Sequence, residues 1–586
     1  MNRSSLRFVI SVLFAACGWP VCARAQEFRA LWADTFHGAM RTGAEVTALV
    51  NAARAGNCNA VVVEVRKRGD AYYRNGLEPV ATDVAAGFDP LADLVVKAHN
   101  TSGGKARIEV HAWMVTYNIW GSQNTAPPQA SHPYNLHPDW LSEKYRAATT
   151  DPVVRWDGAA YPFDQGHPAV QQHTFDVSMD ILRRYDVDGL HFDYIRYSDD
   201  SGGNNQPWGY NPVTVARFKK LKNRVTTPLP TDTVWLQWRR DQVTALLRKV
   251  YLNAWAEKPN VRISAALITY GTNSPGLGAN DWANNSEAYR RVLQDWRGWM
   301  EEGILDLACP MTYKTTNASI TSWVEFIRQR QYRRSAAVGL GWYLNSVAEN
   351  IGQIKLTRAG PAAGPKAAGS LGYSYAVTNE ESVSTANFLK ALTDPATAEI
   401  YDPGGDPVFA APVAPPPMPW KTDTARGHLM GFVKDAATAA VLDGATVSLT
   451  GPAPLTATRA VLTDGTGFFG SVDLPVGTYT ATVSVPGYGT WQRGVAITGA
   501  QVRQESVALG PPVLNLLSWS LEPATRRLTQ TWTSEAGQTF RVEYSDDLQT
   551  WFPAATAIPS GGLTTTYRTP AISPDITRRW WRVRRE

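Results

Sequence analysis

The sequence predicts an α/β fold in which a (β/α)8 TIM-type barrel is followed by two small all-β sandwich domains. Short apolar runs alternate with longer amphipathic segments from Glu27 to about Thr393, which is the pattern of repeated βα units. Eight such units over roughly 370 residues fit a barrel with insertions. From residue 426 onward the pattern changes to short strands that are broken by turns, as in small β-sandwiches.

Eight apolar, β-rich runs are the candidate barrel strands, and amphipathic segments separate them. A doubly wound sheet is the alternative, but no glycine-rich phosphate loop follows the first candidate strand. The expected strands are 28–34, 60–66, 108–117, 189–197, 262–268, 304–313, 336–343 and 369–376. The expected helices include 42–56, 90–100, 169–185, 235–257, 287–302 and 319–330.

The first residues carry the pattern of an export signal. An apolar run from Phe8 to Ala16 follows two arginines, and Ala23-Arg24-Ala25 supplies a cleavage site with small residues. We therefore expect a secreted protein, or one held in the periplasm or cell envelope. A lipoprotein signal ending at Cys17 is less favoured, because Phe14 is bulky for that motif. No later apolar run is long enough to span a bilayer.

Composition excludes several classes of protein. The net charge of +5 is small for 586 residues and does not argue for nucleic-acid binding. Of the four cysteines, Cys58 and Cys309 would remain after the signal is removed, which is too few for a disulfide scaffold. We expect both to be buried thiols. The 22 Trp and 23 Tyr suit either sugar stacking or β-domain cores.

Two further segments mark the organisation of the chain. Residues 116–166 are polar and aromatic without helical periodicity, which predicts a structured loop over the barrel mouth. Prolines crowd the segment before residue 425, which predicts a semi-rigid, extended linker. We therefore predict a signal peptide at 1–25, the barrel at 26–400, the linker at 401–425 and β-domains at 426–510 and 511–586.

The fourth candidate strand ends in a cluster of ionisable side chains. Because alternate side chains of a strand share a face, His191 and Asp193 point one way while Phe192 and Tyr194 point toward the helices. Catalytic groups of such barrels collect at the carboxyl ends of the strands. A carboxylate there is costly unless it is paired or used, so we predict that Asp193 is catalytic and that His191 lies beside it.

The same register places polar groups on one face of the first three strands. Barrel interiors are normally filled by branched apolar side chains, so this concentration points to catalysis or sugar binding at the mouth. Each residue has a structural alternative: a cap for Asp34, an ion pair between Glu64 and Arg66, and core packing for the histidines. The residues on this face are Trp32, Asp34, Glu64, Arg66, Glu109, His111 and Trp113.

Two carboxylates are the minimum for hydrolysis of a glycosidic bond. One protonates the departing oxygen while the other attacks carbon or activates water. Our preferred catalytic pair is Asp193 with Glu64, and this chemistry requires no metal or other cofactor. The predicted substrate-binding residues are Asp34, Arg66, Asp70, His111, Trp113, His191, Arg196, Tyr313 and Trp342.

Several segments of the first domain carry a family resemblance. They are Phe28-Arg29-Ala30-Leu31-Trp32, Val65-Arg66, Arg68-Gly69-Asp70-Ala71, His111-Ala112-Trp113, Phe163-Asp164-Gln165-Gly166-His167-Pro168 and 185–197. On these residues the domain resembles the glycosyl-hydrolase-like family of bacterial envelope proteins, which includes glycosidases of denuded peptidoglycan. The resemblance implies a barrel, a glycan substrate and glycosidase activity, and it supports Asp193 as a catalytic carboxylate. Members often have Gln where this chain has Glu64, so the resemblance leaves the second carboxylate open.

The two β-domains carry resemblances of their own. Residues 426–510 follow the pattern G-x-V-x-D, G-A-x-V, T-D-x-x-G-x-F and L-P-x-G-x-Y, and so resemble the carboxypeptidase regulatory-like, prealbumin-type domain. Residues 511–586 resemble a small fibronectin-type module of secreted bacterial proteins. The resemblances imply spacer or adhesive roles, with contact to a cell surface or a glycan left open.

The sequence therefore predicts a secreted glycoside hydrolase of a bacterial polysaccharide, with peptidoglycan glycan strands as the leading candidate. One alternative is a catalytically inactive carbohydrate-binding or adhesive envelope protein. Another is a metal-dependent hydrolase, but the first strand reads Trp-Ala-Asp-Thr where such barrels commonly carry a His-x-His pair.

Overall fold

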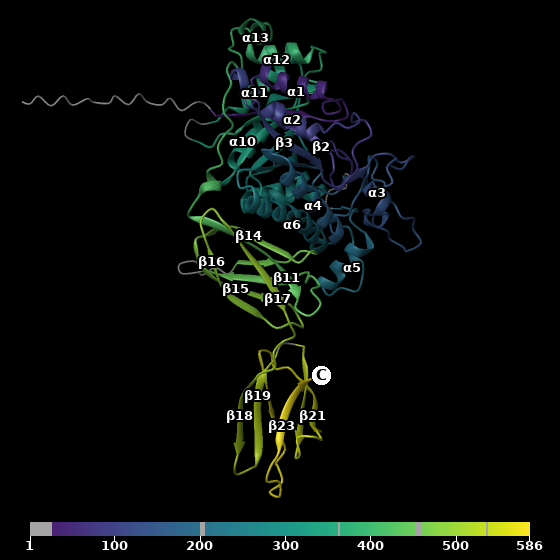
Figure 1. Cartoon of the computed structure of the whole chain (residues 1–586), viewed down its shortest axis with the longest axis vertical. Coiled ribbons are helices and arrows are strands. Elements are labelled where there is room, and N and C mark those ends of the chain that lie inside the picture. Colours follow the sequence, from purple (N-terminus) through teal and green to yellow (C-terminus); the bar gives the residue numbers. More distant parts are fainter. Residues whose placement is uncertain (1–25, 200–204, 361–363, 452–458, 535–536) are drawn as a thin grey trace, which may run out of the picture.

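The computed structural model describes residues 26–199, 205–360, 364–451, 459–534 and 537–586. The predicted signal peptide at 1–25 lies outside the described residues. A barrel forms one end of the molecule, a β-sandwich lies against it, and a second β-module forms the other end (Figure 1). Within the described ranges no helix combines the length and the apolar character needed to cross a membrane.

Eight parallel strands close into a barrel, which confirms the predicted fold class and rules out the doubly wound alternative. Neighbouring strands follow the order β1-β10-β9-β8-β7-β6-β3-β2, as eight successive βα units require. The strands are β1 (Phe28–Ala33), β2 (Ala60–Arg66), β3 (Glu109–Val115), β6 (Gly189–Asp193), β7 (Arg262–Ile268), β8 (Leu307–Thr312), β9 (Ser335–Gly341) and β10 (Gly369–Tyr373).

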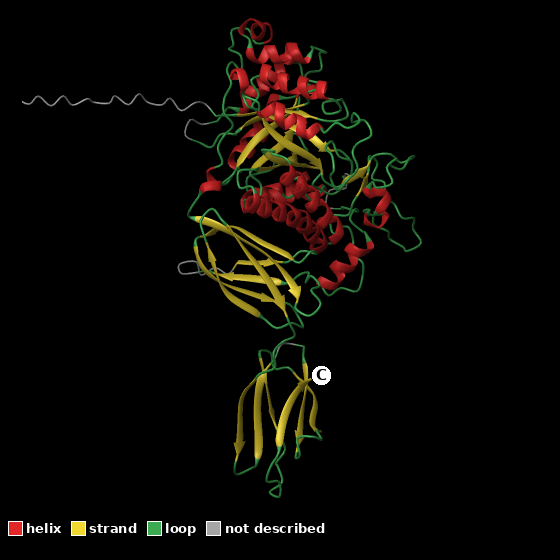
Figure 2. Cartoon of the chain, in the orientation of Figure 1, coloured by secondary structure: helices red, strands yellow, loops and turns green. Residues whose placement is uncertain are grey.

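Helices cover the outside of the barrel (Figure 2). Polar residues cap the starts of these helices. For example, the side chains of Thr42 and Asp89 each accept a hydrogen bond from a backbone N–H in the first turn of the helix that follows. The larger helices are α1 (Gly43–Ala55), α2 (Pro90–His99), α4 (Pro168–Arg184), α5 (Pro212–Leu221), α6 (Thr233–Glu257), α10 (Asn317–Gln329), α11 (Val347–Thr357), α12 (Thr385–Thr393) and α13 (Pro395–Tyr401).

One predicted helix, 287–302, is wrong as a single element. The chain forms two short helices there, α8 (Glu287–Arg291) and α9 (Trp296–Glu302). Leu293 between them has a positive φ of 52°, which a helix cannot accommodate. Asp295 then accepts the backbone N–H of Gly298 and caps α9, so the break is built into the sequence by a capping residue.

The predicted alternation of faces is confirmed on the barrel strands. On β2, Val61, Val63 and Val65 belong to the core between strands and helices, whereas Ala60 and Val62 belong to the core inside the barrel. On the other strands the inner core also holds large aromatic side chains. Cys58 and Cys309 are free and buried, as expected.

The segment 116–166 is a structured insertion. Its strands β4 (Asn118–Trp120) and β5 (Tyr161–Pro162) pair antiparallel, and a short helix α3 (Pro133–Leu136) lies between them. Aromatic contacts hold the insertion together, with ring centroids 5.6 Å apart between Trp120 and His132 and 5.3 Å between Tyr134 and Tyr161. The predicted structured loop is therefore present, and its aromatic side chains pack within it.

The Pro-rich segment 401–425 packs across the amino end of the barrel. Arg29, Asn59 and Arg262 donate hydrogen bonds to its carbonyl oxygens. At its end, Trp420 Nε1 lies 2.6 Å from Asp306 Oδ1, and Lys421 Nζ lies 3.0 Å from Asp306 Oδ2. These contacts cover the end of the barrel opposite to the strand carboxyl ends, so the segment is part of the barrel's packing as well as a connection.

The β-sandwich that follows shares its surface with the barrel. Met430, Phe468 and Val472 belong to the same hydrophobic core as the barrel helices. Arg217 of α5 forms an ion pair with Asp443 at 2.8 Å. The sandwich has two sheets, β14-β11-β17 and β13-β12-β15-β16. Its strands are β11 (Arg426–Asp435), β12 (Thr446–Thr450), β13 (Arg459–Leu462), β14 (Phe468–Pro475), β15 (Gly477–Ser484), β16 (Trp491–Ile497) and β17 (Val502–Leu509).

The C-terminal module is a smaller sandwich of two three-stranded sheets, β18-β19-β22 and β21-β20-β23. Its buried core consists of Trp532, Phe540 and Val542, with partly buried side chains packed around them. The strands are β18 (Leu516–Glu522), β19 (Arg527–Thr533), β20 (Thr539–Ser545), β21 (Phe552–Pro559), β22 (Thr564–Arg568) and β23 (Trp580–Arg585).

Candidate active site

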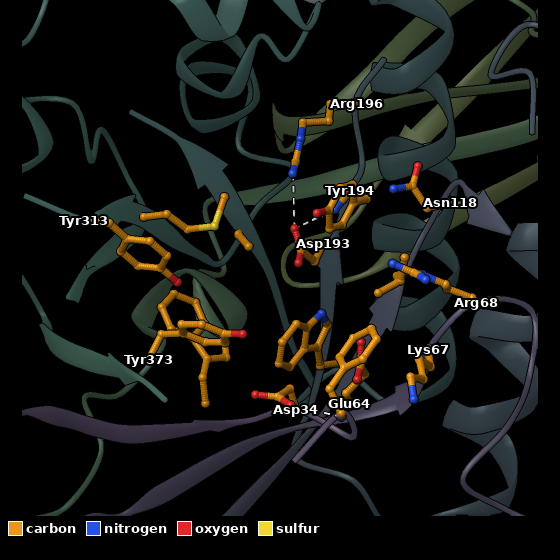
Figure 3. A pocket seen from close by; sticks show the side chains of 16 residues that line it. Asp34, Glu64, Lys67, Arg68, Asn118, Asp193, Tyr194, Arg196, Tyr313 and Tyr373 are labelled. Atoms are coloured by element: carbon orange, nitrogen blue, oxygen red, sulfur yellow. Dashed lines mark hydrogen bonds and ion pairs between the residues drawn. The ribbon is translucent and has the colours of Figure 1, made fainter. Parts of the chain in front are cut away.

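The carboxyl ends of the barrel strands surround a cavity of about 220 Å³. Every barrel strand except β9 contributes to it, together with residues that follow β1, β2, β6 and β8 and with Asn118 of the insertion (Figure 3). This end of a TIM-type barrel is where catalytic groups gather. The lining residues are Trp32, Asp34, Phe36, Glu64, Lys67, Arg68, Trp113, Val115, Asn118, Asp193, Tyr194, Arg196, Ala266, Met311, Tyr313 and Tyr373.

Asp193 is the last residue of β6 and points into the cavity (Figure 3). Its Oδ1 accepts the backbone N–H of Tyr194 at 2.6 Å and Nη1 of Arg196 at 3.1 Å. Both donors stabilise negative charge on the carboxylate. The Arg196 guanidinium also lies 4.1 Å from the centroid of the Tyr194 ring, so the guanidinium contacts both Asp193 and Tyr194.

Tyr194 lines the cavity, so the prediction that it faces the helices is wrong. Strand β6 ends at Asp193, and Tyr194 adopts a left-handed conformation with a φ of 49°. The two-residue alternation of a strand therefore does not extend to it. Its side chain is half-exposed at the mouth of the cavity, where a substrate ring can contact it.

Glu64 lies on β2 and is only 1% exposed. Its Oε2 accepts both the backbone N–H and the hydroxyl of Thr35. Burial raises the pKa of Glu64 to about 7, against the opposing effect of the two Thr35 hydrogen bonds, and the nearby charge of Asp34 adds to the rise. A carboxyl group with such a pKa exists in both protonation states near neutral pH, which is the property of a general acid.

Asp34 follows β1 and has one committed and one uncommitted oxygen. Oδ1 accepts the backbone N–H groups of Phe36 and His37 and lies 2.8 Å from His37 Nδ1. Oδ2 is buried without a hydrogen-bond partner among the described residues. The side chain therefore caps the turn after β1, as the structural alternative proposed, and also lines the cavity.

The three carboxylates lie within electrostatic range of one phenol. Burial raises the pKa of Tyr373, and the charges of Asp34, Glu64 and Asp193 each raise it further. Tyr373 comes from the end of β10 and stacks on Tyr313 at 5.7 Å between ring centroids. The predicted pair of Asp193 and Glu64 thus faces one cavity, with Asp34 as a third acidic group.

Aromatic side chains form the floor and walls of the cavity. The indole of Trp32 packs edge-on against both Tyr313 and Tyr373. Trp113 packs edge-on against Tyr373 at 6.5 Å between centroids. Such rings offer flat apolar faces with few conformational degrees of freedom, and they suit contact with the C–H faces of a sugar.

His191 lies one layer beneath the cavity and does not line it. Trp32 Nε1 donates to His191 Nε2 at 3.2 Å, and the other ring nitrogen lies 2.9 Å from Ser264 Oγ. An indole N–H only donates, so His191 accepts at Nε2 and is neutral, with its proton on Nδ1. Burial, with a smaller effect of His111, holds its pKa well below the usual range. From this position His191 holds the indole of Trp32 by a hydrogen bond.

Four other predicted substrate-binding residues lie outside the cavity lining. Arg66 forms a buried two-point ion pair with Glu78, not with Glu64, and a β-bulge between Glu64 and Arg66 interrupts their common register. His111 contacts Glu109 near the amino end of the barrel. Asp70 accepts the backbone N–H of Arg68, and Trp342 packs against Phe388 of α12.

Several lining residues escaped the sequence reasoning. Lys67 and Arg68 lie in the loop after β2, with their charged groups 4.2 Å and 5.3 Å from the centroid of the Phe36 ring. The run Arg66-Lys67-Arg68 was the available signal for them. Tyr373 was identifiable too, because it lies two residues after the inward-facing Leu371 on β10. Asn118 carried no local signal.

The cavity has no evident metal-binding set. In the part of the chain that the structure describes, no three His, Cys, Asp or Glu side chains group together as metal ligands would. The acidic groups of the cavity are instead engaged by Thr35, by backbone N–H groups and by Arg196.

A comparison with solved structures finds similarity at low sequence identity and low TM-score. The PgaB (BpsB) glycoside hydrolase domain from Bordetella bronchiseptica has a TM-score of 0.43 and 12% identity, and covers 64% of this chain and 98% of that chain. The catalytic domain of beta-amylase from Paenibacillus polymyxa has a TM-score of 0.40 and 9% identity, with 64% and 99% covered.

Two curated relatives each match about half of this chain. Glycosyl hydrolase YngK of Bacillus subtilis (strain 168) is 23% identical over 336 residues, which are 53% of this chain and 60% of the relative. Glycosyl hydrolase DigH of Escherichia coli (strain K12) is 26% identical over 275 residues, which are 44% of this chain and 54% of the relative. The chain thus matches less than two thirds of the length of either relative.

Family models match both of the first two domains. The carboxypeptidase regulatory-like domain matches residues 428–510, in agreement with the resemblance in sequence. The model described as glycosyl hydrolase-like 10 matches residues 27–356, which is more than half of the chain and includes every residue that lines the cavity except Tyr373. The chain therefore belongs to the glycosyl hydrolase-like 10 family.

Proposed function

We propose that this chain is a secreted glycoside hydrolase that cleaves glycosidic bonds in a bacterial polysaccharide, with Asp193 and Glu64 as its catalytic carboxylates. The observation that carries the proposal is the presence, in one aromatic cavity, of a carboxyl group with a pKa of about 7 and a carboxylate paired with arginine. Glycosidases assign different roles to two carboxyl groups by giving them different surroundings in this way.

Glu64 is the general acid of the proposed mechanism. With a pKa of about 7, a substantial fraction of Glu64 is protonated at neutral pH and can deliver its proton to the departing glycosidic oxygen. Thr35 occupies Oε2, so Oε1 is the oxygen that has no protein partner in the described chain and can face the substrate. The Glu64 carboxylate left by this step regains a proton when water replaces the departing sugar, which completes the cycle.

Asp193 is the second catalytic carboxylate. It attacks the anomeric carbon or activates a water molecule for that attack, and Arg196 and the Tyr194 N–H hold it in place. Stereochemistry distinguishes the two routes, because attack by Asp193 itself retains the anomeric configuration and attack by water inverts it. The free Oδ2 of Asp34 provides an acceptor for a sugar hydroxyl in the same cavity.

For the substrate we propose peptidoglycan glycan strands. Lys67 and Arg68 line the cavity without a carboxylate partner within ion-pair distance among the described residues, so the site has positive charge to offer. Muramic acid units that have lost their peptides carry a carboxylate, which matches this charge. The expected export signal would bring the protein to the compartment in which this polymer lies.

The test measures the release of reducing ends from peptide-free glycan strands. We expect Asp193→Asn to lower kcat by about a thousandfold and Glu64→Gln by about a hundredfold or more, as for other positioned acid and base groups. A nitrophenyl glycoside needs little protonation of its leaving group, so Glu64→Gln should lose much less activity on it than on glycan strands. The anomeric form of the first product, followed by NMR, assigns retention or inversion.

Asp186→Asn is the matched control, because the Asp186 side chain is 86% exposed and lies outside the cavity. It should retain full activity. Unchanged turnover by Asp193→Asn would refute the mechanism. Tight binding of glycan strands without any turnover by the unaltered protein would favour the inactive carbohydrate-binding alternative instead.

A further inference from the structure

The C-terminal module has a groove of its own, with a volume of about 450 Å³. Strands β18 and β19 form one side of it, and the chain from Ile572 to Trp581 forms the other. Figure 1 shows the module at the end of the molecule far from the barrel, so the groove is separate from the candidate active site. It lies at the open side between the two sheets of the sandwich.

The groove exposes an aromatic surface that a closed sandwich would bury. Trp519 of β18 pairs with Gln530 of β19, and Leu521 pairs with Leu528, and all four line the groove. These residues share the inward face of their sheet with the buried Trp532. Trp519 is nevertheless 68% exposed. An indole face is thus available beside polar side chains.

A buried polar atom in the groove lacks a partner. Gln530 is only 4% exposed, yet its Oε1 has no hydrogen-bond partner among the described residues. Leaving such an atom unpaired costs stability unless water or a ligand supplies a donor. A hydroxyl group of a ligand can supply that donor, whereas a purely apolar partner surface cannot.

The charged side chains that line the groove are all positive. Arg526, Arg578 and Arg579 line it, and no acidic residue does. Arg526 is occupied by backbone carbonyl oxygens and Arg579 by an ion pair with Asp546 at 2.7 Å. Arg578 lies 5.1 Å from the centroid of the Trp580 ring and has no carboxylate partner in the described chain. The groove therefore favours an anionic ligand.

We propose that this groove binds a sugar unit of an acidic polysaccharide. The sugar ring stacks on Trp519, one of its hydroxyl groups donates to Gln530 Oε1, and its carboxylate lies near Arg578. An aromatic face, a hydroxyl acceptor and a cation together match a carboxylate-bearing sugar better than they match a protein strand or a lipid surface. This assignment does not rest on catalysis by the barrel. It would hold the chain on its polymer through a second contact.

Affinity electrophoresis of the full chain tests the proposal with three polymers. Polygalacturonate carries uronate groups, peptide-free peptidoglycan strands carry lactyl carboxylates, and dextran is neutral. We expect retardation by at least one acidic polymer and little by dextran, and comparison of the two acidic polymers identifies the source of the carboxylate. Retardation should weaken at high salt. Equal retardation by dextran would overturn the acidic specificity.

Three variants locate the site. Trp519→Ala should bind about tenfold more weakly, as expected for loss of a stacking residue, and Gln530→Met should also bind more weakly. Arg578→Glu should lose binding to the acidic polymers. Trp551→Ala is the matched control, since Trp551 lies in the same module outside the groove, and it should bind normally.

A control separates this proposal from the proposed catalysis. Trp519→Ala should melt like the unaltered chain, because most of the side chain is exposed. Its turnover of a short soluble substrate, measured beside that of the unaltered chain, reports on the barrel alone. Normal polymer binding by Trp519→Ala, or equal weakening by Trp551→Ala, would overturn the groove as a binding site whatever the turnover shows.

Discussion

Thr35 donates both its backbone N–H and its hydroxyl to a single oxygen of Glu64. The residue after Asp34 thereby fixes a carboxyl group on the neighbouring strand, and it does so from the turn that follows β1. Both donors favour the charged form of Glu64, whereas burial and Asp34 favour the neutral form. The pKa of about 7 is the balance of these opposing effects.

Thr35→Val removes one of the two donors and keeps the shape of the side chain. Without the hydroxyl, the charged form of Glu64 is less stable and its pKa rises further. A hydrogen bond to a charged group contributes about 1.5 kcal/mol or more, which corresponds to roughly one pKa unit. If Glu64 is the general acid, the alkaline limb of the kcat/KM profile should move up by about one unit. An alkaline limb that does not move would show that Glu64 is not the group that titrates there.

Glu64→Gln should change the pH dependence of stability. The folded-state pKa of about 7 lies above the ordinary glutamate value of 4.5, so the protonated form favours the folded state. This contribution is complete below pH 4.5 and is lost as the pH rises through 7, with a total of about 3 kcal/mol. Gln is neutral throughout. The stability of Glu64→Gln minus that of the unaltered chain should therefore be greater at pH 8 than at pH 4.5.

Thermal unfolding of the barrel at the two pH values measures this difference. Other titrating groups are common to both proteins, so their contributions cancel in the comparison. The prediction fails if the two proteins show the same dependence of melting temperature on pH.

His191→Leu should lower stability without changing the pH dependence of activity. The variant leaves the buried N–H of Trp32 without its acceptor, which costs about 1 to 3 kcal/mol. Because burial keeps His191 neutral, the pH dependence of kcat/KM between pH 5 and 8 should keep its shape. His191→Asn retains an acceptor and should recover part of the stability. Loss of one limb of the profile in both variants would instead assign His191 a direct role.

The sequence predicted the barrel well because its strands alternate strictly between two environments. The apolar rows of β2 and β3 face the helices, and Trp32, Trp113 and His191 face inward as the period of two requires. The predicted catalytic pair lines the cavity for the same reason. A regular backbone makes the direction of each side chain readable from its position.

Several failures lie where the regular backbone stops, whereas His111 and His191 lie on regular strands but outside the cavity lining. Tyr194 follows the end of β6 in a left-handed conformation, and Trp342 follows the end of β9 in a short 3-10 turn that directs it toward Phe388. A β-bulge separates Arg66 from the register of Glu64. Strand periodicity contains no information about these local departures, which depend on tertiary packing.

Arg66 and Glu78 should prove structural. Arg66→Met leaves Glu78 as a buried charge with His173 as its remaining ion-pair partner among the described residues, which should cost about 3 to 5 kcal/mol of stability. Replacing both residues, as Arg66→Met with Glu78→Leu, removes the unpaired charge and should recover much of the loss. Denaturant unfolding of the two variants measures the difference. A double variant less stable than Arg66→Met would contradict this account.

Lys67 and Arg68 should determine the preference for charged substrates. Both cations flank the Phe36 ring at the mouth of the cavity, away from the ion pair of Asp193 and Arg196. Lys67→Ala with Arg68→Ala should raise KM for peptide-free glycan strands by about tenfold, because two partly exposed contacts to a carboxylate each contribute about 0.5 to 1 kcal/mol. KM for the same strands with their carboxylates converted to amides should change little, since those strands have no charge to recognise. Equal effects on both substrates would show that the two side chains shape the cavity without reading charge.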